Sequence, residues 1–61
     1  MELKAFRKSK NLSQESFAQS IGYTLSIVSK IEQGRIKASR NFIDRVKKVY
    51  PDINIEKVFF S

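Results

Sequence analysis

Apolar residues recur along the chain at the spacing of short amphipathic helices. In the first four segments they lie three or four residues apart, in some cases with an adjacent apolar residue: Leu3 and Phe6; Phe17, Ala18 and Ile21; Ile27, Val28 and Ile31; Phe42, Ile43, Val46 and Val49. Such stripes predict helices that turn one face to a core. The expected helices cover about residues 2–10, 14–21 and 25–33, and a stretch from residue 40 to just before Pro51.

Residues that start and stop helices stand at the boundaries of these segments. The side chains of Ser13, Thr24 and Ser39 precede three of them and are expected to act as N-caps. Gly22 and Gly34 follow the second and third segments, where a left-handed residue commonly ends a helix. Asn11 tolerates the same conformation after the first segment, and Pro51 disfavours helix at the residue before it.

The last ten residues are the least decided part of the pattern. A fifth helix is expected to begin near Asn54 and to pack through Ile55, Val58 and Phe59. The run 58–60 is equally compatible with a short terminal strand, because it is too short for its period to decide. We therefore expect an all-α fold of five short helices, in a single domain that spans residues 1–61.

Composition narrows the class of protein. The chain has 61 residues, of which 41% are hydrophobic, and it contains neither cysteine nor histidine. Disulfides and thiolate or imidazole metal sites are thereby excluded, and we expect no cofactor. No apolar run approaches the ~20 residues of a membrane span, and basic residues interrupt any leader-like start. These features indicate a soluble, cytoplasmic protein without a membrane partner.

Charge points to a class of partner. Lysine and arginine number 12 against 6 acidic residues, for a net charge of +6, and the sequence pI is near 10.0. Such a basic balance in a small domain is typical of nucleic-acid binding. An enzyme is not expected, because the chain lacks histidine, cysteine and a glycine-rich phosphate loop, and its carboxylates form no evident catalytic motif. No small-molecule ligand is evident.

The middle of the chain carries the most specific signal. It reads Ser-Gln-Glu-Ser-Phe-Ala over residues 13–18, Ile-Gly-Tyr-Thr over 21–24 and Val-Ser-Lys-Ile-Glu-Gln-Gly over 28–34. This order describes two short helices joined by a tight glycine turn. The second helix has a polar outer face and an apolar inner one, as a helix-turn-helix that reads the major groove requires.

This run resembles the Cro and phage-repressor family, also called the XRE family. The family's pattern is Ser-Gln-Glu-x-Leu-Ala, Leu-Gly-Val-Ser, then Ile-Ser-Lys-Ile-Glu-Asn-Gly. The chain differs at five places, each time by a residue of similar physical type: Phe17, Ile21, Tyr23, Thr24 and Gln33. Residues 3–8 resemble the family's first helix and residues 50–54 its link to a fifth helix, so the likeness covers essentially the whole chain.

The resemblance implies a bundle of five helices that binds double-stranded DNA. Its second helix would lie across the DNA backbone, with Gln14 on a phosphate, and its third would enter the major groove. The residues implied at base edges are Leu25, Ser26, Ser29 and Lys30, and those along the backbone are Gln33, Arg35, Lys37 and Arg40. Thr24, the expected cap of the third helix, is implied as a further DNA-binding residue. Leu25 departs from the family, which often has a polar residue there. A leucine has no hydrogen bond to give to a base; it contacts a thymine methyl or simply covers apolar surface.

Two further expectations follow from the resemblance. Arg7 of the first helix and Glu32 at the end of the third match a pair of residues that bind each other in the family, although they are also compatible with two independent surface charges. The function implied is a transcription regulator, a repressor that binds a palindromic operator as a homodimer, formed in solution or only on DNA. The alternative is an antitoxin or another protein-interaction module, in which Phe59 and Phe60 would face a different protein.

Overall fold

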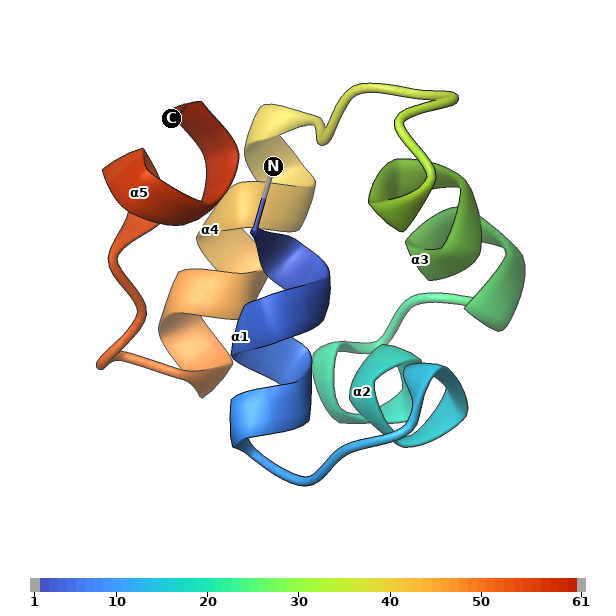
Figure 1. Ribbon diagram of the computed structural model, residues 1–61, viewed down its shortest axis with the longest axis horizontal. Helices are drawn as coiled ribbons and strands as arrows, with labels where there is room; N and C mark the ends of the chain where they lie inside the picture. The colour runs from blue at the N-terminus through green and yellow to red at the C-terminus, as the bar shows by residue number, and fades with distance from the viewer. Residues whose placement is uncertain (1, 61) are drawn as a thin grey trace.

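The helices begin and end close to the positions that the sequence predicts. In the computed structural model, which describes residues 2–60, they are α1 (Leu3–Ser9), α2 (Gln14–Ile21), α3 (Leu25–Glu32), α4 (Arg40–Val49) and α5 (Ile55–Phe60) (Figure 1). Residues 58–60, for which the sequence allowed a helix or a strand, are helical, and residues 2–60 contain no strand. Helix α3 ends one residue earlier than predicted, because Gln33 is its C-cap and Gly34 follows with a left-handed φ of 76°.

Side-chain caps define the start of four helices. The hydroxyls of Ser13, Thr24 and Ser39 accept hydrogen bonds from the backbone N–H three residues on, at 3.0, 3.3 and 3.1 Å. The Oδ1 of Asn54 accepts from the Lys57 N–H at 3.0 Å. Each cap satisfies a donor that would otherwise lack a partner at the helix end. These short local signals are the reason that the boundaries are predictable from sequence.

One core joins all five helices. Its fully or nearly fully buried residues are Leu3, Phe17, Ala18, Ile21, Val28, Ile31, Phe42, Val46, Ile53 and Val58. Helix α2 packs against both α3 and α4, and α1 packs against α5. Figure 1 shows α3 and α5 on opposite sides of the molecule, with α1 and α4 between them. The outer face of α3 therefore lies away from the C-terminal helix.

An aromatic side chain that the stripe pattern did not single out fills the core beside α4. The ring of Tyr50 stacks on Phe17 at 5.6 Å and meets the edge of Phe6 at 5.8 Å between centroids. Its hydroxyl lies 2.6 Å from the Ser20 Oγ. Val49, predicted to face the core, is instead 37% exposed. It is the last residue of α4, and the next residue, Tyr50, is the one that packs on the core.

The turn between α2 and α3 is held by a residue of α4. Gly22 adopts a left-handed φ of 75°, as the sequence predicts, and its N–H and that of Tyr23 return to carbonyls of α2. Arg45 crosses from α4 and donates from Nη1 to the Ile21 carbonyl at 3.0 Å. The negative, C-terminal end of the α2 dipole also stabilises a cation at this position. The guanidinium thus fixes the geometry of the turn from outside the motif.

We expect Gly22→Ala to destabilise the protein more than Gly34→Ala. Both glycines are left-handed, so each substitution costs about 1–2 kcal/mol in backbone strain. A Cβ at Gly34 meets nothing within 4 Å, whereas one at Gly22 lies 2.7 Å from Arg45 Nη1. Losing the Arg45 hydrogen bond adds about 1 kcal/mol. Urea unfolding of both variants, in the wild-type and Arg45→Ala proteins, measures the difference. Equal costs with Arg45 present would show that the guanidinium moves aside freely.

Candidate nucleic-acid interface

Helix α3 divides into a buried and an exposed face. Val28 and Ile31 are 0% and 1% exposed and form part of the core. Ser26 and Lys30 are exposed on the opposite side, and Leu25, the first residue of the helix, is 45% exposed. The residues expected at base edges thus share the outward side of one short helix, with Ser29 half-buried at its margin.

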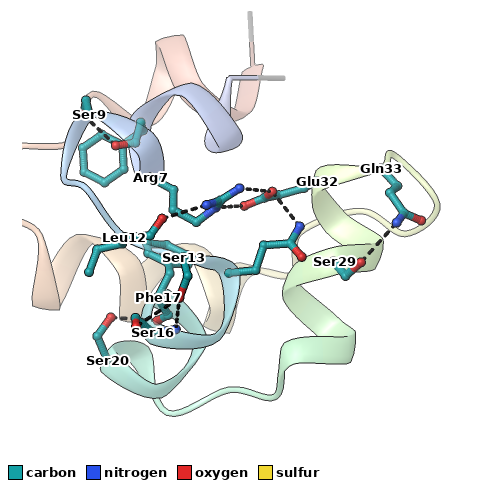
Figure 2. Close-up of polar contacts among 12 residues, drawn as sticks. Arg7, Ser9, Leu12, Ser13, Ser16, Phe17, Ser20, Ser29, Glu32 and Gln33 are labelled. Atoms are coloured by element: carbon teal, nitrogen blue, oxygen red, sulfur yellow. Dashed lines mark hydrogen bonds and ion pairs between the residues drawn. The ribbon is translucent and has the colours of Figure 1, made fainter.

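Three polar side chains in or next to α3 take part in local hydrogen bonds. The Thr24 hydroxyl accepts from the Ile27 N–H and so fixes the first turn. The Gln33 amide donates to the Ser29 Oγ at 3.1 Å, as Figure 2 shows. Both bonds leave hydrogens free on the amide and on the hydroxyls. Thr24, Ser29 and Gln33 are therefore oriented in the free protein and still able to donate to another molecule.

Cations continue the surface beyond the end of α3. Arg35 and Lys37 are exposed in the loop from α3 to α4, and Arg40 is exposed at the first position of α4. Within residues 2–60 none of these three, nor Lys30, forms an ion pair with a carboxylate. The end of α3, the loop after it and the start of α4 thus carry positive charge that no carboxylate of the described residues pairs with, which suits a polyanion.

The predicted pair between Arg7 and Glu32 is confirmed, and it is part of a larger network. Arg7 donates to both carboxylate oxygens, from Nε at 2.7 Å and from Nη2 at 3.1 Å (Figure 2). Its Nη1 donates to the Leu12 carbonyl at 2.7 Å. The two side chains are only 7% and 2% exposed. A bidentate geometry, with the third guanidinium nitrogen also hydrogen-bonded, is the arrangement in which a buried pair is tolerated.

Gln14 joins this network, which the sequence did not predict. Its amide Nε2 donates to Glu32 Oε1 at 3.0 Å, so the residue expected on a DNA phosphate is also bound to the end of α3. One amide hydrogen remains for another acceptor. The spacing from α2 to α3 gives no sign of this bond, because it depends on how the two helices cross.

The electrostatics of Glu32 show a further cation that sequence reasoning missed. Burial alone would raise the pKa of Glu32, but hydrogen bonds from Arg7 and Gln14, with the charges of Arg7 and Lys4, lower it below its usual 4.5. The ionised carboxylate therefore stabilises the fold fully above pH 4.5 and loses that contribution as the pH falls through the lowered pKa. Lys4 precedes Arg7 by one helical turn, a spacing that places both on one side of α1.

We expect removal of either partner of the buried pair to cost about 3–5 kcal/mol at neutral pH, because the other charge is left unpaired. The double variant Arg7→Met/Glu32→Leu should recover part of this, since no buried charge remains. It should not recover all, because the Leu12 carbonyl loses its donor, at about 1–3 kcal/mol. Thermal and urea unfolding of the two single variants and the double variant measure the coupling. Small, additive losses would show that the two charges act independently.

The comparison with known protein families agrees with this geometry. A family model described as helix-turn-helix matches residues 3–57, which include the turn, α3 and the network that holds them. No curated protein and no solved structure matches the chain significantly. None of the described helices is long and apolar enough to cross a membrane. The chain therefore belongs to the helix-turn-helix family of DNA-binding regulators of the Cro and C1 repressor type.

Proposed function

We propose that this protein is a sequence-specific transcription regulator that sets α3 into the major groove of duplex DNA. The observation that carries the proposal is the contrast between the two sides of α3. Its outward polar and apolar side chains are exposed, while its inward side chains are buried in the core. In helix-turn-helix proteins the residues near the start of the second helix meet base edges. The uncompensated cations beyond the end of α3 suit the phosphates on either side of the groove.

The proposed contacts fall into two groups. Residues assigned to base edges are Leu25, Ser26, Ser29 and Lys30. Residues assigned to the sugar–phosphate backbone are Gln14, Thr24, Gln33, Arg35, Lys37 and Arg40. Backbone contacts fix the register of α3 on the duplex, and base contacts supply the sequence preference.

We further propose that the protein binds a palindromic operator as a dimer and represses by occupying it. Half-sites for this motif lie about one helical turn, ~34 Å, apart, so symmetric DNA calls for a symmetric protein. The molecule measures 23 × 23 × 20 Å between Cα extremes, so two copies in successive major grooves approach contact distance. Occupied DNA of this length excludes polymerase from an overlapping promoter.

A small apolar surface is the candidate contact between the two copies. Phe60 is 69% exposed and stands between hollows that Ala38 and Ile43 help to line, and Phe59 is half-buried beside it. Lys37 lines one of these hollows, and Arg40 and Asp44 line the other, so the surface adjoins the proposed backbone contacts. Two copies of charge +6 repel each other in free solution. DNA removes that repulsion, which favours association on the operator.

The same surface is the observation that favours a second candidate function, an antitoxin-like protein-interaction module. In that case Phe60 contacts a different protein, and DNA binding is secondary. The two candidates differ in a direct way, because only the first makes association depend on symmetric DNA.

We expect Lys30→Ala to lose discrimination at one base pair per half-site, by about 1–3 kcal/mol, because a lysine on a base edge donates to guanine O6 or N7. Lys37→Ala should weaken all sequences alike and reduce the salt slope by about one unit, as expected for one phosphate contact. Binding titrations of both variants against a selected site and its single-base variants, at several salt concentrations, measure this. If Lys30→Ala weakens binding to every sequence equally, Lys30 contacts a phosphate and not a base. Wild-type binding that is indifferent to salt would contradict the proposed function.

We expect Phe60→Ala to abolish association on palindromic DNA while leaving stability within about 0.5 kcal/mol, because the side chain is on the surface. Val49→Ala is the matched control: it removes an exposed apolar side chain that lines neither hollow. Sedimentation of each protein with and without a site of two half-sites gives the stoichiometry. A strictly one-to-one wild-type complex on a site with two intact half-sites would rule out the dimer.

A further inference from the structure

Leu25 is an apolar side chain at a place where the proposed function calls for base recognition. It is the first residue of α3 and is 45% exposed, although its neighbours on the outward side, Ser26 and Lys30, are polar. Leu25 is not part of the buried core, although it precedes Val28 by one helical turn and so lies at the edge of the core-facing stripe. The inference below rests on the proposed function and concerns what this one side chain contacts.

The first turn of α3 holds the position of Leu25 in the free protein. The Thr24 hydroxyl caps the helix through the Ile27 N–H, and the N–H of Val28 bonds to the Thr24 carbonyl at 3.2 Å. Ser29, one turn further, is itself bonded to Gln33. The backbone at Leu25 is therefore ordered in the free protein, and only the side-chain rotamer of Leu25 can change when DNA binds.

The chemistry of the major groove leaves one favourable partner for such a side chain. Adenine, guanine and cytosine present hydrogen-bonding atoms there, and a leucine packed on them strips water away without replacing its hydrogen bonds. Thymine also presents the C5 methyl group, which buries apolar surface on both sides of the contact. A leucine therefore favours thymine for two reasons. It gains an apolar contact with the methyl group, and it leaves the hydrogen-bonding atoms of the base edges in contact with water.

We propose that Leu25 reads the C5 methyl group of a thymine in each half-site. The group recognised is then a 5-methylpyrimidine rather than a base pair as such. Cytosine methylated at C5 carries the same methyl in the same place. Methylation of a cytosine placed at that position should therefore strengthen binding through Leu25, even though the hydrogen-bonding atoms of the pair are unchanged by it.

Replacing each thymine of the selected half-site by deoxyuridine, one at a time, tests the proposal, because uracil lacks only the methyl group. We expect one position at which the wild-type protein binds about fourfold more weakly, the value of one buried methyl group. Leu25→Ala should bind thymine and uracil equally at that position. Cytosine and 5-methylcytosine at the same position should differ for the wild-type protein and not for the variant.

Ile36→Ala is the matched control, since it removes an apolar side chain, 39% exposed, that lies outside α3. It should keep the full sensitivity to uracil. The proposal fails if wild-type and Leu25→Ala proteins respond alike at every thymine while salt-dependent binding persists, and the proposed function then stands. If the wild-type protein shows no salt-dependent binding to duplex DNA, the proposed function and this inference fall together.

Discussion

The contact between Arg7 and Glu32 is the constraint on which the arrangement of this fold depends. The apolar core supplies the driving force for folding, but apolar contacts are not directional and tolerate small rotations of one helix on another. A bidentate ion pair with both side chains nearly buried is directional and constrains such rotations. It joins α1 to the last residue of α3, and the bond to the Leu12 carbonyl adds the link that leads into α2. The direction of α3 is thereby set by hydrogen bonds.

This constraint also acts at the proposed DNA surface, through Gln14. The carboxylate that pairs with Arg7 accepts from the Gln14 amide as well, so the first residue of α2 and the last of α3 meet at one oxygen atom. If α2 lies across the backbone and α3 in the groove, this atom lies where both helices approach the DNA. The same interaction that keeps the fold rigid then holds a phosphate-binding side chain in register with the base-reading helix.

The sequence predicts local features well and distant contacts poorly, for physical reasons that particular residues illustrate. The caps at Ser13, Thr24 and Ser39 were predictable because each acts on a backbone group only three residues away. The Arg7–Glu32 pair came from resemblance alone, since 25 residues separate its members. The bond from Arg45 to the Ile21 carbonyl and the stacking of Tyr50 on Phe17 had no local signal. Contacts of this kind exist only once the helices have packed.

The division of labour within α3 explains how one small fold can serve different sequences. Its inward residues Val28 and Ile31 are fully buried, so substitution there disturbs the core. Substitution of Glu32 leaves the buried Arg7 without its partner charge. Its outward residues contribute little to folding, because a surface side chain on a helix is replaced at a cost within about 0.5 kcal/mol. Under the proposed function, base preference is therefore free to vary at the outward residues, while the orientation of α3 is fixed by the inward ones. Gln14 is the exception, because a change there would alter both the proposed backbone contact and the hydrogen bond to Glu32 at the end of α3.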